Sequence, residues 1–296
     1  MKTELIIISY NTAELTLQCI ESAYKYGGID ELEICVVDNA STDDTIESIR
    51  NKFPNVRIVE NPENYGYAKA CNIGAFSSEA DFIVLSNSDI IFKQDSLLNL
   101  VKRLTEDERL GIVGPQQYYR DGSRQRSAGL APSPGSVLVE HIGFEKLYSA
   151  FCQLVKMSPQ YPDGYIDGAV LCIINEVYKE LNGMDEDFFF YSEELDLCKR
   201  LRQKGYINET LLDSKVIHLR GGSGDRLSEK SVRMLLESKY KYLCKHYSEK
   251  AARKYSRSSY IAFQFKYSVF RFISKNRADN QKLFAKELKR IWKHGI

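Results

Sequence analysis

The chain has 296 residues, 43% of them hydrophobic and 27% charged, which excludes a disordered or low-complexity protein and allows one large domain or two ordinary ones. No apolar stretch approaches the roughly 18 residues of a membrane-spanning helix, so we expect none. The net charge of +1 combines 22 basic and 35 acidic side chains in residues 1–225 with 19 basic and 5 acidic ones in residues 226–296, which predicts two parts with different partners.

Predicted strands and helices alternate over the first 90 residues. Strands are expected at Leu5–Ser9, Glu33–Val37, Val56–Val59 and Phe82–Leu85. Helices are expected after Asn11, after Ser41 and over Asn64–Phe76, and Asn11 is expected to cap the first of them. The first apolar run is shorter than the roughly 7–15 residues of a signal-peptide core, so we expect no signal peptide. The alternation predicts an α/β fold with a doubly wound, mostly parallel sheet.

Polar residues follow three of the predicted strands. Ligands of parallel α/β sheets bind beyond the carboxyl ends of the strands, and these ends carry Ser9, Tyr10, Asn11, Asp38, Asn87, Ser88 and Asp89. Asp38 could accept a hydrogen bond from a nucleobase or ribose, or it could only cap the turn into the next helix. Asp89 could hold Mg²⁺ or Mn²⁺ on a diphosphate, although its Asn and Ser neighbours also favour a plain turn.

The segment from Asn64 to Gly74 combines small residues with two asparagines. Its glycines and alanines permit a ligand or the sheet to approach the backbone closely, and the N-terminus of a helix favours phosphate. The segment lacks the G-x-G-x-x-G fingerprint, which disfavours a nicotinamide site and therefore a dehydrogenase.

The middle of the chain, residues 111–222, is expected to be more irregular, with a helix over Ser192–Lys204 and a strand over Lys215–Leu219. Acidic residues flank four consecutive aromatic ones just before this helix. Carboxylates in the first turn suit the helix dipole, but a carboxylate beside an aromatic wall can have the raised pKa of a general base. His218 is expected to be structural, or a cation ligand if an acidic site lies nearby.

Five blocks of sequence, in this order, resemble those of glycosyltransferase family 2, the inverting enzymes of the GT-A fold: IISYN, VVDNASTD, NxGYAKACNxG, LSNSD, and GMDEDFFFYSEELDLCKRL followed by HLRGGS. The similarity covers residues 3–247 and looks most like the bacterial rhamnosyltransferase-like branch of polysaccharide and O-antigen synthesis. It implies a Rossmann-like, mostly parallel central sheet flanked by helices. Residues 1–90 would be the nucleotide-binding half of a catalytic domain, 91–225 its acceptor half, and 226–296 a helical extension.

The resemblance also implies roles for individual residues. Donor-binding residues would be Ser9, Tyr10, Asn11, Asp38, Asn64, Gly66, Lys69, Asn72, Asn87, Ser88 and Asp89. Residues near the sugar and acceptor would be Gly168, Ala169 and Asp196. Asp89 and His218 would hold the divalent cation, Mg²⁺ or Mn²⁺. Glu194 stands where the family has the catalytic Asp of an E-D pair, so it would be the base with a different reach, and Glu193 is the alternative.

The activity implied is transfer of rhamnose or another hexose from a dTDP- or UDP-sugar to a hydroxyl of a glycan or lipid-linked acceptor in cell-surface polysaccharide synthesis. The base would deprotonate that hydroxyl, which would displace the nucleoside diphosphate in one inverting step, while the cation would neutralise charge on the leaving group. The alternative is a non-catalytic protein that binds a sugar nucleotide or glycan and retains the fold. The intact set of carboxylates disfavours that alternative.

Residues 227–296 combine positive charge with ten aromatic side chains between Tyr240 and Phe272. Two interpretations are open: an extension whose aromatic side chains pack on the catalytic domain, or helices at the surface of an anionic membrane. Nucleic acid is not expected as a partner, because no recognition motif accompanies the charge. The seven cysteines, an odd number without C-x-x-C, predict reduced thiols and a cytoplasmic protein, which the membrane interpretation would place at the inner face of the cell membrane.

Overall fold

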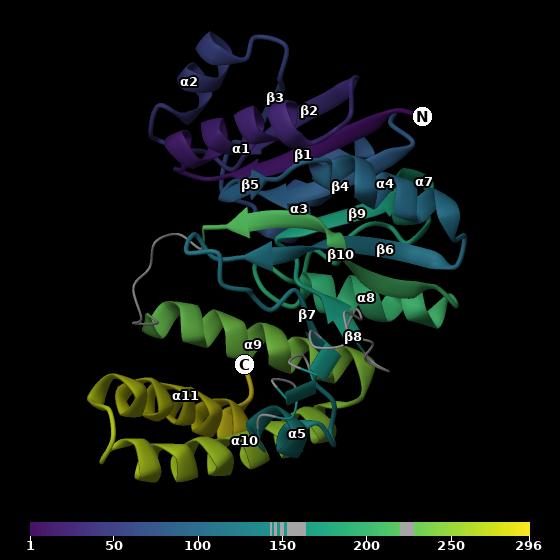
Figure 1. Ribbon diagram of the computed structural model, residues 1–296. Coiled ribbons are helices and arrows are strands. Elements are labelled where there is room, and N and C mark those ends of the chain that lie inside the picture. The colour runs from purple at the N-terminus through teal and green to yellow at the C-terminus, as the bar shows by residue number, and fades with distance from the viewer. Residues whose placement is uncertain (143, 145–146, 149–150, 153–163, 220–227) are drawn as a thin grey trace. The chain divides into compact units, whose positions relative to one another are not determined.

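The computed structural model describes residues 1–142, 144, 147–148, 151–152, 164–219 and 228–296 (Figure 1). Internal contacts divide the chain into two compact units. Unit 1 comprises Met1–Gly129, Cys152–Phe189 and Glu193–Gly221, and unit 2 comprises Leu130–Phe151, Phe190–Ser192 and Gly222–Ile296. The expected boundary between residues 225 and 226 lies outside the described residues.

Unit 1 begins with four strands connected by helices. These elements are β1 (Thr3–Ser9), α1 (Ala13–Tyr26), β2 (Leu32–Asp38), α2 (Thr45–Lys52), β3 (Arg57–Glu60), α3 (Tyr67–Phe76) and β4 (Phe82–Asn87). The strands lie in the order β3-β2-β1-β4, and each neighbouring pair is parallel, as the alternation predicts. Ser9 pairs with Asp38, and Ile8 pairs with Asn87. The carboxyl ends of β1, β2 and β4 therefore lie level at one edge of the sheet.

Four further strands complete a mixed sheet of eight. They are β5 (Ile90–Phe92), β6 (Leu110–Tyr118), β9 (Val170–Ile174) and β10 (Ile207–His218), and the full order is β3-β2-β1-β4-β9-β6-β10-β5. β9 is antiparallel to β4 and β6, whereas β10 is parallel to β6 and antiparallel to β5. β7 (Ala128–Leu130) and β8 (Gly164–Ile166) form a separate two-stranded sheet. The predicted Rossmann-like, mostly parallel sheet is thereby confirmed.

The prediction that residues 111–222 are irregular is wrong for β6 and β9, which lie in the middle of the sheet. β6 is buried over its first eight residues and β9 over its first four. A strand covered on both faces shows no alternation of apolar and polar residues. The glycines and the proline of β6 are also residue types that are typical of loops.

Helices cover both faces of the sheet (Figure 1). α1 and α4 (Ser96–Glu106) bury Ile20 and Leu100 in one apolar cluster with Leu5 of β1. On the opposite face α3 contacts β1 and β2 so closely that a Cβ on Gly74 would lie 2.5 Å from Ile6. Alternate residues of β1 thus enter two different cores, which explains why the strand is apolar on both faces.

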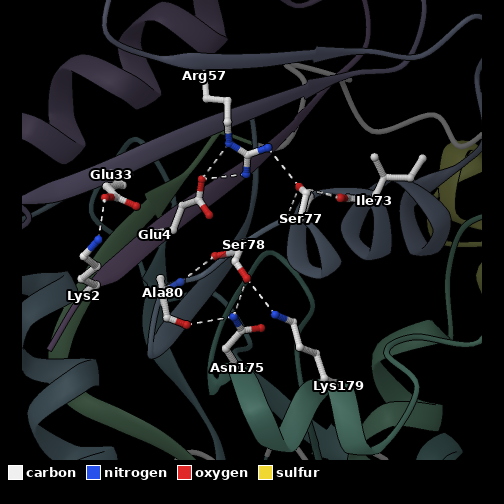
Figure 2. Close-up of polar contacts among 11 residues, drawn as sticks. Lys2, Glu4, Glu33, Arg57, Ile73, Ser77, Ser78, Ala80, Asn175 and Lys179 are labelled. Atoms are coloured by element: carbon white, nitrogen blue, oxygen red, sulfur yellow. Dashed lines mark hydrogen bonds and ion pairs between the residues drawn. The ribbon is translucent and has the colours of Figure 1, made fainter.

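The amino-terminal edge of the same strands is joined by structural contacts (Figure 2). Arg57 pairs with the buried carboxylate of Glu4 at 2.8 Å. Asn175 and Lys179, on α7 (Asn175–Glu180), donate to the carbonyl of Ser78 at 3.2 and 2.7 Å. An open cavity of about 580 Å³ adjoins α7 at this edge, away from the polar carboxyl ends of the strands. These contacts tie α3, α7 and the sheet into one body.

Unit 2 is built from helices. They include α5 (Val137–Ile142), α9 (Glu229–His246), α10 (Glu249–Phe270) and α11 (Lys275–His294), which confirms the C-terminal helical extension. The three long helices contact one another pairwise (Figure 1). Ser228, Ser248 and Ser274 each precede one of them and accept a hydrogen bond from the backbone N–H three residues on. Phe263 and Phe284 stack with ring centres 4.8 Å apart, which joins α10 to α11.

Leu130–Phe151 groups with these helices, although the predicted boundary assigned it to the first part of the chain. Glu140 of α5 accepts a hydrogen bond from Tyr255 at 2.6 Å and pairs with Lys239 at 3.4 Å. Lys239 and Tyr255 follow Glu140 by about a hundred positions, so no local sequence pattern reveals the contact.

The described residues contain no helix that is long and apolar enough to cross a membrane. All seven cysteines are free thiols, and six of them are buried.

Candidate active site

Asn11 joins two loops at the carboxyl edge of the sheet. Its backbone has a positive φ of 53°, and its side-chain Oδ1 accepts a hydrogen bond from the N–H of Thr42 at 2.7 Å. Its own N–H donates to the hydroxyl of Ser41 at 2.8 Å. The expected capping of α1 by Asn11 is wrong, since the N-cap position belongs to Thr12. Asn11 instead holds the loop after β1 against the loop after β2.

A cluster of hydroxyl groups connects the ends of β1 and β4. The Oγ of Ser9 lies 3.1 and 2.9 Å from the hydroxyls of Thr12 and Thr16, and Thr12 lies 2.9 Å from the Oγ of Ser88. Ser9 and Ser88 are buried. The N–H of Asn87 donates to the carbonyl of Ala169 at 3.0 Å. These contacts position the loop that carries Asp89.

Asp38 lies in the turn after β2 and is 1% exposed. Its carboxylate accepts hydrogen bonds from the N–H and Oγ of Ser41 at 2.8 and 2.5 Å. This geometry favours the turn-capping interpretation of Asp38. Tyr10, by contrast, is 49% exposed at the same edge and presents a ring to which a planar ligand could bind.

Because Gly66 has no side chain, α3 can begin in close contact with the backbone of Phe189. Its φ is +81°, and a Cβ there would lie 2.2 Å from the carbonyl oxygen of Phe189. The Oδ1 of Asn64 accepts from the N–H of Gly66 at 2.9 Å, which fixes the turn. Lys69 lies on the first turn of α3 with its Nζ 3.9 Å from the ring centre of Tyr65. The N-terminus of α3 and a cation thus lie in one place, which suits an anionic ligand.

The side chain of Asn72 has no hydrogen-bonding group left to bind a sugar nucleotide. Its Oδ1 accepts from the hydroxyl of Tyr178 and the N–H of Met184 at 2.7 and 2.9 Å. Its Nδ2 donates to the carbonyl of Met184 and to Glu186 at 2.8 and 3.0 Å. An amide has two acceptor and two donor positions, and all four are used. The structure therefore corrects the expected donor-binding role of Asn72 to a structural one.

Asp196 is also structural rather than part of an acceptor site. It is fully buried on α8 (Glu193–Gln203) and accepts a hydrogen bond from Nε of Arg200 at 2.6 Å. Arg200 in turn donates to the carbonyls of Leu181 and Gly183 at 2.8 Å each. The ion pair thereby secures α8 to the preceding segment.

A chain of polar contacts starts at the two predicted cation ligands. The Nε2 of His218 lies 3.4 Å from Oδ1 of Asp89, and its Nδ1 lies 3.0 Å from Oε1 of Gln117. Gln117 donates through Nε2 to Asp167 at 3.3 Å. The oxygen of this amide can accept from Nδ1 of His218, and the Nε2 of the ring faces Asp89. The structure thus brings the two predicted ligands together from β10 and the loop after β4.

Glu193 and Glu194 open α8 as a buried pair of carboxylates. Burial raises the pKa of both, and the neighbouring charges of Glu193 and Asp167 raise the pKa of Glu194 further. The Oε2 atoms of both residues are buried without a hydrogen-bond partner among the described residues. Gly168 lies directly against this pair, since a Cβ there would be 3.2 Å from Cβ of Glu194. A carboxylate that is desolvated and unpartnered is suited to accept a proton from a ligand.

Two neighbours of the pair come from elements far away in the sequence. Tyr67, at the start of α3, donates to the carbonyl of Gly168 at 2.9 Å. Arg126 is exposed, and its positive charge opposes the rise in the pKa of Glu194. Sequence reasoning missed Gln117, Arg126 and Asp167. Of the three, only Asp167 could have been found from the sequence, because it directly precedes the predicted Gly168–Ala169 turn.

Asp89 and His218 fit a divalent cation that shares its coordination with a ligand. A carboxylate oxygen and an imidazole nitrogen that face each other at 3.4 Å are both groups that can coordinate a divalent cation. Within the described residues, no group of three or more His, Cys, Asp or Glu side chains could enclose an ion. Mg²⁺ is commonly held by one or two carboxylates together with substrate phosphates and water, and the present pair matches that pattern.

Comparison with known proteins identifies the family. The model of glycosyl transferase family 2 matches residues 4–157, which is more than half of the 296-residue chain. The chain belongs to glycosyl transferase family 2. It is a glycosyltransferase, an enzyme that transfers a sugar from a nucleotide sugar. The matched range includes Asp38 and Asp89, whereas the carboxylate pair and His218 lie beyond it.

Individual relatives resemble this glycosyltransferase in sequence or in fold. N-acetylglucosaminyl-diphospho-decaprenol L-rhamnosyltransferase of Mycobacterium tuberculosis is 26% identical over 211 residues, which cover 66% of this chain and 69% of the relative. Mannosyltransferase PcManGT from Pyrobaculum calidifontis, in complex with GDP-Man and Mn²⁺, has a TM-score of 0.64 at 18% identity over 99% of this chain and 88% of that one. GalNAc-T7 with UDP, GalNAc and Mn²⁺ has a TM-score of 0.60 at 12% identity over 99% and 57%. The expected GT-A fold is confirmed by these structures.

Proposed function

We propose that this glycosyltransferase is an inverting enzyme that moves rhamnose, or another hexose, from a dTDP- or UDP-sugar to a hydroxyl of a glycan or lipid-linked acceptor in cell-surface polysaccharide synthesis. The observation that carries the catalytic part is the buried carboxylate pair Glu193 and Glu194, whose Oε2 atoms have no hydrogen-bond partner among the described residues. The similarity to a mycobacterial L-rhamnosyltransferase, named for a diphospho-decaprenol acceptor, supports rhamnose and a lipid-linked acceptor.

Glu194 is the proposed base. Its Oε2 takes the proton from the acceptor hydroxyl, the hydroxyl oxygen forms a bond to the anomeric carbon, and the bond from that carbon to the diphosphate oxygen breaks. Because the attack comes from the face opposite the leaving group, the anomeric configuration inverts. Glu193 and Asp167 raise the proton affinity of Glu194, which suits it to hold that proton. Glu193 is the alternative base.

Asp89 and His218 are the proposed ligands of a divalent cation, Mg²⁺ or Mn²⁺. When bound, the cation would neutralise negative charge on the departing diphosphate. The Oε1 of Gln117 lies 3.0 Å from Nδ1 of His218, and donation from Nδ1 to this oxygen would orient the ring with Nε2 toward the cation. Both fold relatives described above contain Mn²⁺, which supports this assignment.

The nucleotide and sugar are proposed to lie along the carboxyl edge of the sheet and the start of α3. The residues proposed to face the donor with side chain or backbone are Ser9, Tyr10, Asn11, Asp38, Asn64, Gly66, Lys69, Asn87, Ser88 and Asp89. Tyr10 is suited to stack on the base because it is exposed, and Lys69 is suited to pair with phosphate. Gly168 and Ala169 are proposed to lie near the sugar, since Gly168 adjoins Glu194.

Glu194→Gln tests the base assignment. We expect turnover to fall by about 10²–10⁴ while the Kd for the donor is nearly unchanged, because the substitution removes the proton acceptor and keeps the shape. Transfer from a panel of dTDP-, UDP- and GDP-sugars with Mg²⁺ or Mn²⁺ measures turnover, and titration calorimetry measures donor binding. The control is Glu106→Gln at an exposed carboxylate on α4, which should transfer normally.

Near-normal transfer by Glu194→Gln together with inactive Glu193→Gln would move the base to Glu193. If neither variant loses transfer, the pair is not catalytic. If the wild-type protein binds a donor but neither transfers nor hydrolyses its sugar with any acceptor, the non-catalytic binding protein becomes the better interpretation. We further propose a cytoplasmic location, which the seven free cysteines and a nucleotide-sugar donor support.

A further inference from the structure

Unit 2 exposes a stripe of large apolar side chains along α10 and the turn that follows it. The stripe consists of Ile261, Phe265, Val269, Phe272 and Ile273, which are 42–78% exposed. Residues four positions apart lie on one side of a helix, so Ile261, Phe265 and Val269 share one face of α10, and Phe272 and Ile273 follow in the turn after its last residue. A monomeric protein rarely leaves so many large apolar side chains together in water, and such a patch marks an interaction site.

Two exposed apolar side chains of α5 lie on the helix next to α10. Leu138 and Ile142 are 69% and 62% exposed. α5 is held to α10 by His141, whose ring centre lies 4.9 Å from that of Phe263 and whose Nδ1 lies 3.1 Å from Nζ of Lys266. The exposed apolar surface therefore includes a segment that lies outside residues 227–296.

The charge around the stripe has a single sign. Residues 250–278 contain eight Lys and Arg residues and no Asp or Glu. Exposed basic side chains lie toward both ends of the stripe: Lys254 and Arg257 toward its start, and Arg271, Lys275 and Arg277 toward its end. This distribution is complementary to a surface that is itself negatively charged and apolar beneath the charge.

The aromatic residues of unit 2 divide into two groups. Tyr240, Tyr242 and Tyr255 are at most 4% exposed and pack inside the protein. Phe265 and Phe272 are 71% and 78% exposed. Burial within the protein therefore accounts for the first group, and the stripe needs another partner.

We propose that the apolar stripe and its flanking basic residues form a docking surface for an anionic lipid bilayer, with α10 lying in the plane of the interface. Phenylalanine and isoleucine would enter the boundary between headgroups and acyl chains, while Lys and Arg would contact anionic headgroups. Nucleic acid would satisfy the charge but not the apolar stripe. This surface is independent of the proposed sugar transfer, so either assignment can fail alone.

Co-sedimentation of the full-length protein with vesicles tests the surface. We expect binding to vesicles of equal parts phosphatidylglycerol and phosphatidylcholine, weak binding to phosphatidylcholine alone, and release at high salt. Phe265→Ser/Phe272→Ser should lower the partition coefficient by about tenfold or more because it removes apolar contact. Arg271→Gln/Lys275→Gln/Arg277→Gln should lower it by roughly a hundredfold, since each basic residue near an anionic surface contributes about fivefold.

The matched control is Phe76→Ser/Ile207→Ser, which removes two side chains of unit 1 that are 47% and 42% exposed. It should bind anionic vesicles like the wild type. Circular dichroism confirms folding of each variant, and the basic triple variant decides the question if the double Phe variant is unfolded. The proposal is overturned if the wild type ignores anionic vesicles, if it binds neutral vesicles equally well, or if folded variants of the stripe and the basic residues bind unchanged. The first of these results would indicate a protein partner instead.

Discussion

Individual carboxylates in this glycosyltransferase differ mainly in what satisfies their oxygens. Asp38 accepts two hydrogen bonds from Ser41, and Asp196 is paired with Arg200. Glu193 and Glu194 each retain a buried oxygen without a partner among the described residues. Burying a carboxylate in this way costs folding free energy, which is typical of a site that supplies its partner from a ligand.

The raised pKa of Glu194 predicts how stability depends on pH. Because the folded-state pKa of Glu194 lies above its unfolded value, ionisation of Glu194 lowers the free energy of unfolding as the pH rises through the folded pKa. Glu194→Gln should therefore raise the melting temperature by a few degrees at pH 8, since a tenfold difference in proton affinity between the folded and unfolded states corresponds to about 1.4 kcal/mol. Below the unfolded pKa the wild-type residue is protonated in both states, and the gain should vanish.

Differential scanning calorimetry of the wild type and Glu194→Gln at pH 8 and at pH 4 measures this difference. Glu106→Gln, at an exposed carboxylate, should change the melting temperature little at either pH. A Glu194→Gln protein that melts below the wild type at pH 8 would show that the carboxylate stabilises the fold, contrary to the assignment.

The sequence motifs anticipate that some residues lie together and leave the surroundings of others undetermined. The pairing of Asp89 with His218 joins two residues expected as cation ligands from motifs 129 positions apart. Asn72 and Asp196 occupy motif positions, yet the amide of Asn72 is fully hydrogen-bonded and Asp196 is paired with Arg200. A motif shows which side chain is present, but hydrogen-bond saturation depends on partners from other elements.

Among the elements, α3 depends most on one residue at its start. Gly66 combines a positive φ of +81° with a Cβ position that would lie 2.2 Å from the carbonyl oxygen of Phe189. The N–H of Tyr67 donates to that same carbonyl at 2.8 Å. α3 is thereby connected both to the sheet and to the segment that precedes α8. The helix α8 carries the proposed base.

Gly66→Ala should destabilise the protein and displace α3. Alanine would have to adopt the positive φ of Gly66, and its Cβ would lie 2.2 Å from the carbonyl oxygen of Phe189. Gly122→Ala is a matched control, since Gly122 has the same φ of +81° with nothing within 4 Å of its Cβ position. The control should cost about 1 kcal/mol from backbone conformation alone, and Gly66→Ala should cost about 2–4 kcal/mol.

Urea unfolding of both variants measures the two costs. Equal destabilisation by Gly66→Ala and Gly122→Ala would mean that the contact with Phe189 is not maintained in solution. The difference between the variants therefore isolates the packing of α3 from the conformational preference of glycine.

Periodicity predicted the elements of the first half and not those of the middle. Strands β1 to β4 alternate with helices and end in turn residues, so local pattern sufficed. β6 and β9 are buried among other strands, and their residues lack the alternation that identifies a half-exposed strand. β9 lies beside β4 through pairing between segments about 90 residues apart, and β6 pairs with β9 and β10.

At the scale of the whole molecule, charged and aromatic residues are distributed unevenly between the two units. The basic and aromatic residues concentrate in unit 2, where the proposed docking surface lies.

Burial raises the pKa of Cys19, Cys35 and Cys198 to about 12 and also raises that of Cys71 and Cys172. Cys244 is the one cysteine that is only half-buried.

The native protein should therefore expose at most one reactive thiol. A thiolate, not a thiol, attacks a disulfide reagent, so buried cysteines with a raised pKa react only when the protein opens. Titration with an aromatic disulfide at pH 8 should show no more than one fast equivalent in native buffer and seven in guanidinium. Cys244→Ser should abolish the fast equivalent. Two or more fast equivalents from the native wild type would contradict the described packing.

The sequence alone determined the α/β class, the order of the first strands, the basic C-terminal helices and the motifs that indicate a glycosyltransferase. The first three depend on local periodicity, on turn residues and on charge, which act between residues close in the chain, whereas the motifs indicate the family through their resemblance to its members. Only the tertiary structure decided that Gln117 orients His218, that Asp167 lies beside the carboxylate pair, and which aromatic residues of α9 and α10 face water. Desolvation and hydrogen-bond saturation arise from segments a hundred residues apart, so they exist only once the chain has folded.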